Sequence, residues 1–377
     1  MIKVINVVQD FNMGGIQSVL LSLLRAFQND PEVNYSVVVL ESARGSEFDR
    51  IAVEEQLNIV YLDCKMPKNK NPYIRKFFRD LSYNGRLYRY LRKQKPDIVH
   101  THNTRMLALI RKCIKWTRKK YVWFHTLHSD PYAVHEGHIP KIQQVVNEYG
   151  VHPVCLNETQ FCRAQERYGL KSCDYIYNMV NLKKFHNILQ NKQKCRKKLE
   201  IPNNAYVIGT VGRLDAVKNY RFLMRIFSII AKRNPEAILV FTGDGEESEL
   251  LHHDAKQYGV DERVRFLGVQ RNTPEIYPVF DIFVSTSLFE SSSLVVLEAQ
   301  VTGLPCVTSA ACPKESVISD KVVRMGKDAS DEEWVEQLLS PSDWSLQYAE
   351  EADYSEERVK DSLKNLYRNV FMKDKNK

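Results

Sequence analysis

Two glutamates, with three serines among the seven residues between them, form the segment with the clearest chemistry in this chain. At about 100° per residue, eight positions rotate an α-helix by about 80° beyond full turns, so Glu290 and Glu298 would not share one helix face. The pair therefore predicts Glu290 on a loop and Glu298 on the helix that follows. The serines 291–293 can cap this helix and leave its first N–H groups, around Leu294, open to a ligand. A loop carboxylate, open N–H groups and a helix carboxylate then line one short path. This order suits a ligand with hydroxyls at two ends and an anion in the middle, which describes a nucleotide sugar.

Two cations bracket a short loop after another predicted strand. The apolar run 206–211 predicts the strand, and Arg213 and Lys218 follow it before a helix that starts at Asn219. Fixed cations at a strand's carboxyl end can bind a diphosphate and stabilise charge on a departing nucleotide. The alternative is an ordinary pair of surface cations, but the Glu290–Glu298 segment favours a binding site.

Glycines and one histidine extend the candidate site to other strand ends. Gly14 and Gly15 join the first strand to a helix, where paired glycines let backbone N–H groups approach a ligand, although a tight turn needs them too. Gly243 follows a later strand and offers its backbone to the nucleotide. His125 ends a strand and should point at the ligand to bond a sugar hydroxyl; the alternative is a structural histidine with satisfied ring nitrogens.

These residues fall on loops because the chain alternates apolar runs with helical patterns. Such alternation predicts an α/β fold of two doubly wound, Rossmann-like domains that face each other across a cleft. The predicted strands cover 2–8, 35–40, 57–63, 97–102, 121–127 and 152–157, then 206–211, 237–242, 263–268, 281–286 and 305–309. The predicted helices cover 16–27, 74–94, 104–115 and 158–169, then 220–233, 246–258, 292–302 and 331–339.

A polar, basic stretch near the middle of the chain separates the two patterns. We therefore predict one domain at 1–178 and a second at 179–342. The charged segment 343–377 is predicted to be helical and to pack back on the first domain. A length of 377 residues with 44% hydrophobic content is sufficient for two cores.

Composition argues against several classes of protein. No run approaches the roughly 18 apolar residues of a membrane span, and residues 1–8 indicate a strand rather than a signal peptide, so we expect a cytoplasmic protein. The eight cysteines form no close CxxC pair, which favours scattered reduced thiols. His100 and His102 would share one strand face, but no carboxylate stands beside them in helical register, so a metal site is not expected.

Positive charge is concentrated in one stretch of the chain. Residues 65–120 hold 18 Lys or Arg against two acids, a local charge of +16 in a chain of net charge +8. Aromatic residues alternate with the cations at helical spacing within 75–79 and 86–92. This mixture suits an anionic membrane surface, where rings and stems are buried and charges meet headgroups. A solvated helix face is the alternative, and no nucleic-acid module accompanies the patch.

Together these motifs resemble the retaining glycosyltransferases of family 4, which have the GT-B fold, and especially their bacterial capsule and exopolysaccharide branch. The resemblance runs in family order over residues 1 to about 340. Its pieces are Met13-Gly14-Gly15, Asp97–Asn103, Phe124-His125-Thr126, Gly212-Arg213-Leu214, Lys218-Asn219, Gly243-Asp244-Gly245, Glu290 with Glu298, Ala299-Gln300 and Gly303-Leu304-Pro305. Two positions depart from the family pattern, since Ser291 stands where Gly is usual and Asn181 where the linker often has Asp.

The resemblance implies transfer of a sugar from a nucleotide sugar, with UDP as the expected nucleotide, to a lipid-linked or other saccharide acceptor. Glu298 would hold the ribose hydroxyls, and Glu290 would face the transferred sugar. Arg213 and Lys218 would bind the diphosphate in place of a divalent ion, so neither metal nor cofactor is expected. The anomeric configuration would be retained.

The first domain would bind the acceptor, with Gly15 near the phosphates and His125 at the donor sugar or the reacting carbon. The protein would be peripheral on the inner face of the plasma membrane. One alternative is another GT-B enzyme, such as a nucleotide-sugar epimerase or hydrolase, but the first half lacks suitable acid and base carboxylates. The other is a non-catalytic partner that binds a glycan, which the intact cations and glutamates argue against.

Overall fold

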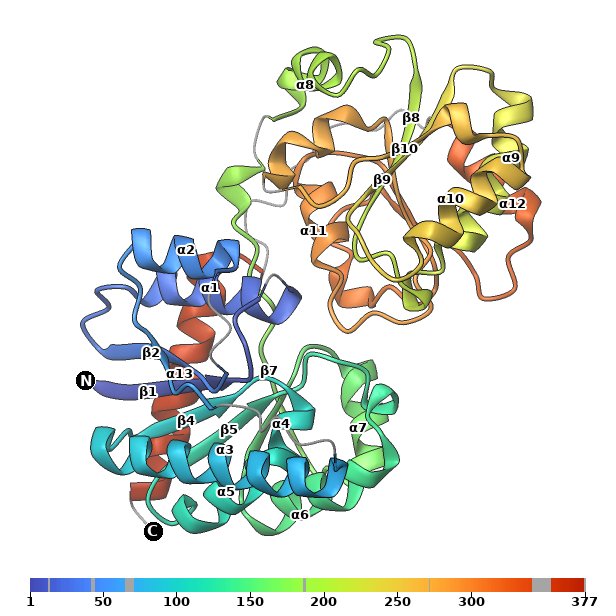
Figure 1. The fold of residues 1–377 in the computed structure, drawn as a ribbon. Helices are drawn as coiled ribbons and strands as arrows, with labels where there is room; N and C mark the ends of the chain where they lie inside the picture. Colours follow the sequence, from blue (N-terminus) through green and yellow to red (C-terminus); the bar gives the residue numbers. More distant parts are fainter. Residues whose placement is uncertain are drawn as a thin grey trace. The chain divides into compact units, whose positions relative to one another are not determined.

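The computed structural model describes residues 1–12, 14–41, 45–64, 71–185, 188–270, 272–340 and 354–375. The chain divides into two compact units. Unit 1 comprises Met1–Met179 together with Asp353–Lys377, and unit 2 comprises Val180–Ala352. Each unit is a parallel sheet with helices on both faces (Figure 1), which confirms the predicted α/β, Rossmann-like fold class.

The sheet of unit 1 is doubly wound, with the strand order β3-β2-β1-β4-β5-β6-β7. Its inner strands β1, β2, β4 and β5 are largely buried on both faces, as parallel strands between helices require, and the first three of them are rich in Val and Ile. The strands are β1 Ile2–Val8, β2 Val33–Val39, β3 Ile59–Tyr61, β4 Ile98–Thr101, β5 Val122–Thr126, β6 His152–Cys155 and β7 Asp174–Tyr175. The helices are α1 Gly15–Phe27, α2 Glu47–Glu54, α3 Pro72–Gln94, α4 Thr104–Leu109, α5 Arg111–Thr117, α6 Ile139–Glu148, α7 Glu158–Tyr168 and α13 Glu356–Lys375.

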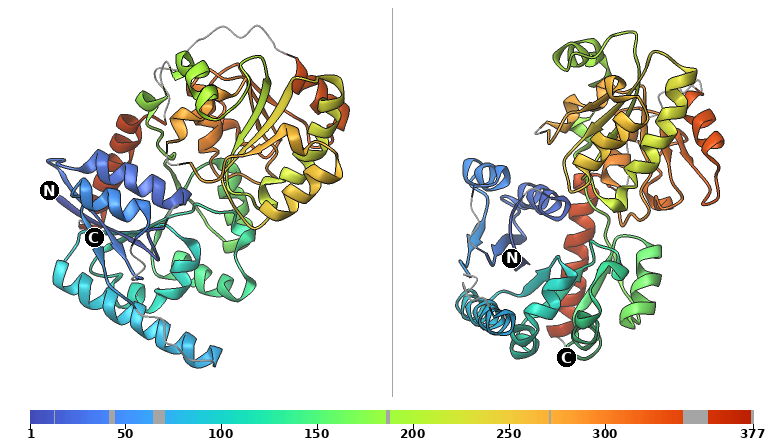
Figure 2. Two further views of the ribbon diagram at one scale, coloured as in Figure 1. Left: turned by 45° about the horizontal axis from the view of Figure 1, so that its top comes forward. Right: turned by 45° about the vertical axis from the view of Figure 1, so that its right-hand side comes forward.

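The C-terminal helix α13 belongs to unit 1, where it packs against α1 and β5. In both figures it runs along the sheet of this unit (red in Figures 1 and 2). Lys360 lies 2.8 Å from the buried Asp30 carboxylate. The Tyr367 hydroxyl lies 2.6 Å from Nδ1 of His100, inside the core. Two buried polar contacts therefore fix the helix on the sheet.

The sheet of unit 2 has the strand order β10-β9-β8-β11-β12-β13. Helix α9 places its Leu, Ile and Phe side chains in the core of this unit, as its 3.6-residue spacing predicts. The strands are β8 Tyr206–Val211, β9 Ala237–Thr242, β10 Val264–Phe266, β11 Ile282–Ser285, β12 Cys306–Thr308 and β13 Val322–Arg324. The helices are α8 Lys192–Lys198, α9 Tyr220–Arg233, α10 Ser248–Gln257, α11 Leu294–Val301 and α12 Asp331–Leu339.

The prediction of one helix over 104–115 is wrong, because the segment forms two helices that meet at Ile110. The cause is the buried side chain of Asn84 on α3. Its amide donates to the Leu109 carbonyl at 2.8 Å and accepts from the Cys113 N–H at 2.8 Å. These two groups would otherwise bond each other in a continuous helix, so the Asn84 amide replaces one helical hydrogen bond.

Five elements were not predicted from the sequence: α2, α6, α8, β7 and β13. The two strands are very short and lie at sheet edges, where an apolar run is weakest. Within the described ranges, no helix combines the length and the apolar character that crossing a membrane would require.

Candidate active site

The candidate site of unit 2 forms where the strand order reverses. Strands β8 and β11 are neighbours at the middle of the sheet, and the chain winds outward from them in opposite directions. The loops that follow the two strands therefore diverge at their carboxyl ends, which is where doubly wound sheets bind ligands. The first loop carries Arg213 and Lys218, and the second carries Glu290.

Hydrogen bonds join these two loops and fix the position of Lys218. The Thr286 hydroxyl donates to the Lys218 carbonyl at 2.9 Å, and the Leu288 N–H donates to the Val217 carbonyl at 2.7 Å. The Asp215 carboxylate accepts from the Lys218 N–H, which closes the turn before α9. The backbone on both sides of the Lys218 side chain is thereby anchored.

Lys218 and Glu290 form an ion pair at the centre of the site. Nζ of Lys218 lies 2.7 Å from Oε1 of Glu290, and the Ser287 hydroxyl donates to the same oxygen at 2.7 Å. Burial alone would lower the pKa of Lys218, but the Glu290 carboxylate outweighs it and leaves the pKa above its ordinary value. The amine is therefore charged at neutral pH and available to an anion.

Arg213 is not brought into this ion pair. Its side chain is 69% exposed, and its Nε lies 3.9 Å from the Asp215 carboxylate. A guanidinium so weakly restrained can turn toward a phosphate, although no described residue of unit 2 fixes it there. The two predicted cations thus differ, since Lys218 is held by an ion pair and Arg213 is exposed to solvent.

Glu298 lies on α11, as predicted, and accepts a hydrogen bond from the buried Tyr277 hydroxyl. Burial raises the pKa of Glu298 to about 7, and the hydrogen bond from Tyr277 offsets only part of that rise. The carboxyl is therefore close to half-protonated at neutral pH. A group that donates hydrogen bonds to it, such as a pair of hydroxyls, would favour the ionised form.

The three serines do not cap α11 as predicted. The N-cap residue is Ser293, whose side chain makes no capping hydrogen bond, and the Leu294 N–H donates to the Ser292 carbonyl at 3.0 Å. The helix starts two residues later than predicted because the serines continue the loop.

The hydroxyls of Ser292 and Ser293 are buried and lack a hydrogen-bond partner among the described residues. Buried hydroxyls usually have a hydrogen-bond partner, so these two groups can donate to a bound molecule.

Gly243 has a structural role in the loop after β9. Its φ is +132°, and a Cβ at this position would lie 1.9 Å from the Gly212 carbonyl oxygen. Its N–H donates to the Gly268 carbonyl at 2.9 Å and so is not available to a nucleotide. Glycine is required here because the loops after β8 and β9 touch.

In unit 1, Gly14 and Gly15 lie at the start of α1, with Gly14 as the N-cap residue. A Cβ on Gly15 would meet no atom within 4 Å, and both glycines are exposed. Open backbone at a helix start is consistent with the predicted approach to an anion. Met13, which precedes them in the motif, lies outside the described residues.

His125 lies in the core of unit 1 and not at an open surface. The side chain is completely buried, with Nδ1 2.9 Å from the Thr101 hydroxyl and Nε2 3.2 Å from the Thr104 hydroxyl. Burial lowers the pKa of His125 to about 3, which keeps the ring neutral. Both ring nitrogens are occupied within unit 1, so the structural alternative describes this histidine.

The ring nitrogens of the neighbouring histidines also form hydrogen bonds within the core and are not open to a ligand. His100 contacts Thr126 and Tyr367, and His102 contacts Asn6 and His128. The rings of His100 and His102 stack with centroids 4.3 Å apart. Burial lowers the pKa of both histidines, so the cluster is a neutral part of the core.

Sequence reasoning missed three residues that shape the site. Ser287 holds Glu290, Tyr277 holds Glu298, and Thr286 ties the Lys218 loop to the next strand. Ser287 lies three residues before Glu290, and that spacing within one loop could have indicated it. Tyr277 is far from Glu298 in sequence, and no local pattern indicates their contact.

Two family descriptions match successive parts of the chain. Residues 13–184 match the family described as Glycosyltransferase Family 4, and residues 191–341 match the family described as Glycosyl transferases group 1. Together the two matches extend over most of the chain. The chain therefore belongs to the glycosyltransferases with the GT-B fold.

Individual relatives agree with this assignment. The chain is 29% identical to the UDP-Gal:α-D-GlcNAc-diphosphoundecaprenol α-1,3-galactosyltransferase of Escherichia coli over 233 residues. The matched region covers 59% of this chain and 60% of that protein. The match thus spans less than two thirds of the relative's length.

Solved structures show the same fold at low identity. Sucrose-phosphate synthase from Thermosynechococcus elongatus has a TM-score of 0.77 at 17% identity, over 99% of this chain and 100% of that one. Anabaena HepE in complex with UDP-glucose has a TM-score of 0.74 at 16% identity, over 100% of this chain and 99% of that one.

Proposed function

We propose that this protein transfers a sugar from a UDP-sugar to a saccharide acceptor, with retention of the anomeric configuration and without a metal ion. The observation that carries the proposal is the ion pair between Lys218 and Glu290. It places a charged amine and a carboxylate side by side at the carboxyl ends of neighbouring strands. A sugar diphosphate needs this combination, because its phosphates are anionic and its sugar offers hydroxyls.

In this proposal unit 2 binds the donor. Lys218 and the exposed Arg213 contact the diphosphate, and the buried hydroxyls of Ser292 and Ser293, which have no partner among the described residues, donate to its oxygens. Glu298 accepts hydrogen bonds from the ribose hydroxyls. The choice of UDP is supported by the UDP-glucose bound to the HepE structure and by the UDP-galactose in the name of the E. coli relative.

The proposed reaction needs no covalent enzyme intermediate. The acceptor hydroxyl attacks the anomeric carbon on the face from which the nucleotide leaves. The bond between the anomeric carbon and the phosphate oxygen breaks, and that phosphate accepts the hydroxyl proton. Lys218 stabilises the negative charge that develops on the leaving diphosphate, while Glu290 lies beside the sugar. His125 has no step in this scheme, because its nitrogens are engaged in the core.

The acceptor in this proposal is a lipid-linked saccharide bound by unit 1. The E. coli relative is named for an acceptor carried on diphosphoundecaprenol, which supports the choice. Such an acceptor lies at a membrane, so the protein would act as a peripheral protein on the inner face of the plasma membrane, in the synthesis of a surface polysaccharide such as capsule or exopolysaccharide.

Helix α3 supplies a surface suited to that location. Its C-terminal part is held in the core by Tyr83, Leu87 and Leu91, all fully buried. Its N-terminal part extends beyond the neighbouring helices (Figure 2, left) and exposes Phe77 by 61% and Phe78 by 51%. Exposed rings within a stretch of charge +16 favour binding to anionic lipid over simple solvation.

A transfer assay with the purified chain tests the proposal. UDP release is measured with a panel of UDP-sugars, with and without a GlcNAc-diphosphate-lipid acceptor, in the presence of EDTA. We expect one donor to release UDP faster with the acceptor, EDTA to have no effect, and NMR to show an unchanged anomeric configuration in the product. An inverted product, a requirement for metal, or no release with any donor would refute the corresponding part.

A further inference from the structure

We propose that a cavity in unit 1, at the carboxyl ends of β4 and β5, binds the diphosphate of a prenyl-diphosphate acceptor. The cavity has a volume of about 540 Å³, within the range of small-molecule sites. It is lined by Asn103 and Arg105 after β4 and by residues of the loop 129–138 after β5. The inference rests on the proposed function, since it locates one part of the proposed acceptor.

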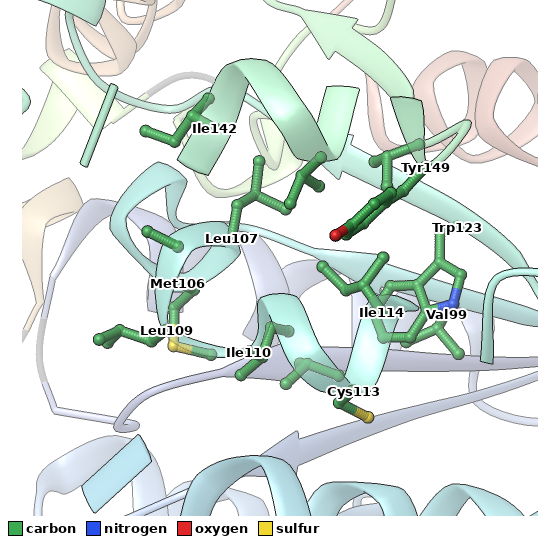
Figure 3. Packing of buried hydrophobic residues seen from close by; sticks show 14 of the residues in the cluster. Val99, Met106, Leu107, Leu109, Ile110, Cys113, Ile114, Trp123, Ile142 and Tyr149 are labelled. Carbon is green, nitrogen blue, oxygen red and sulfur yellow. The ribbon is translucent and has the colours of Figure 1, made fainter. Parts of the chain in front are cut away.

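Arg105 is placed on the cavity by the packing of α4. This helix has six residues, of which Thr104 and 106–109 are buried, so Arg105 is its single exposed side chain. Met106 and Leu107 insert into the core against α5 and α6 (Figure 3). The Asn103 side chain fixes the start of the helix by accepting from the Arg105 N–H at 3.0 Å. The core therefore fixes the backbone from which the Arg105 side chain extends toward the cavity.

The charge balance around the cavity favours an anion. Among its lining residues there is no acid, and in the described part of the chain Arg105 takes part in no ion pair. The nearby acids of the same loop are already neutralised, because Asp130 binds Arg163 at 2.7 Å and Glu136 binds Arg167 at 2.6 Å. The guanidinium thus remains available for a planar, bidentate contact with phosphate.

His135 adds a second donor to the cavity. Its Nδ1 accepts a hydrogen bond from the Gly137 N–H at 3.0 Å, so the neutral ring carries its proton on Nε2. The side chains of Ala133 and Val134 form an apolar wall beside it. The Arg105 guanidinium and the His135 ring N–H can bind a diphosphate, and the apolar wall can contact the isoprenoid chain that follows it.

The test is equilibrium binding of geranyl diphosphate to the full chain, with UDP present at saturation so that the donor site is filled. We expect Arg105→Glu to weaken binding at least tenfold and Arg105→Lys to weaken it less. The matched control is Lys171→Glu, an exposed lysine between α7 and β7 at the amino ends of the strands. It makes the same change of net charge in unit 1 and should leave binding within twofold of the wild type.

The outcomes separate this inference from the proposed function. Equal affinity of the wild type and Arg105→Glu, or no binding by the wild type, would overturn the inference, whereas the UDP-release assay tests the transfer activity by itself. Inorganic diphosphate is the second probe. If it bound as tightly as geranyl diphosphate with the same dependence on Arg105, the occupant would be a free anion and the assignment to the acceptor would be wrong.

Discussion

Replacing Glu298 by Gln should remove a pH dependence that this carboxyl imposes on stability. Burial raises the pKa of Glu298 from the ordinary 4.5 to about 7, with the Tyr277 hydrogen bond acting in the opposite direction. The unfolded chain releases the proton near the ordinary pKa, whereas the folded chain holds it to about pH 7. The folded state therefore binds more protons in this window, and the free energy of unfolding falls as the pH rises.

The size of the effect follows from the two pKa values. Each pH unit of difference corresponds to about 1.36 kcal/mol, so the stability contribution of the protonated carboxyl decreases by about 3 kcal/mol. It is fully present below the ordinary pKa and is lost as the pH rises through about 7. The amide of Glu298→Gln can still accept from Tyr277 and does not titrate. The difference in unfolding free energy, wild type minus variant, should therefore fall by about 3 kcal/mol.

Scanning calorimetry of both proteins across this pH window measures the difference. The variant changes only unit 2, so the transition of that unit should shift and the transition of unit 1 should serve as an internal reference. A difference that does not vary with pH would show that the Glu298 carboxyl is ionised throughout. Burial would then not raise the pKa of Glu298, and the reasoning from burial would be refuted.

Four further changes test other parts of the structure. Lys218→Ala should raise the barrier to sugar transfer by about 2–4 kcal/mol, measured as kcat/KM, because it removes a positioned cation; an unchanged rate would exclude Lys218 from the diphosphate site. Glu290→Gln should lower kcat yet tighten UDP binding several-fold by calorimetry, since Lys218 loses its competing carboxylate; weaker UDP binding would contradict this. Phe77→Glu with Phe78→Glu should reduce binding to vesicles of anionic lipid at least tenfold in a sedimentation assay. Val53→Glu, at a residue of α2 that is 78% exposed, is its control and should bind like the wild type. Tyr367→Phe should lower the free energy of unfolding by about 1–3 kcal/mol in urea titrations, because Nδ1 of His100 loses its buried partner; no change would mean that water replaces the hydroxyl.

The sheets could be predicted because their strands are continuous apolar runs bounded by polar loops. The run Ile2–Val8 and the run Tyr206–Val211 both form central strands with the predicted bounds. The break at Ile110 could not be predicted, since it depends on Asn84, which lies 26 residues earlier in the chain. A side chain from a neighbouring helix that replaces a helical hydrogen bond leaves no mark in local sequence.

The candidate site was predicted where its residues follow strands, and less well where orientation matters. Glu290 and Lys218 follow neighbouring strands, so parallel topology alone brings their loops together. His125 also lies at a strand end, but successive side chains of a strand face opposite sides, and its side faces the core. The sequence pattern does not distinguish these cases for a polar residue in a buried strand, because both faces are apolar.

In the proposed site, the ion pair at Lys218 would let a carboxylate and a diphosphate lie side by side. Glu290 alone would repel an anion, and at about 4 Å two unit charges interact by about 4 kcal/mol at an effective dielectric constant near 20. An ammonium group has three donors, of which Glu290 receives one, so the same amine can also contact a phosphate oxygen. A cation that lies between two anions is closer to each anion than the anions are to each other, so the attraction exceeds the repulsion. In the proposal, one anchored lysine would therefore be sufficient to hold Glu290 and the first phosphate together, and the exposed Arg213 would balance the charge of the second phosphate.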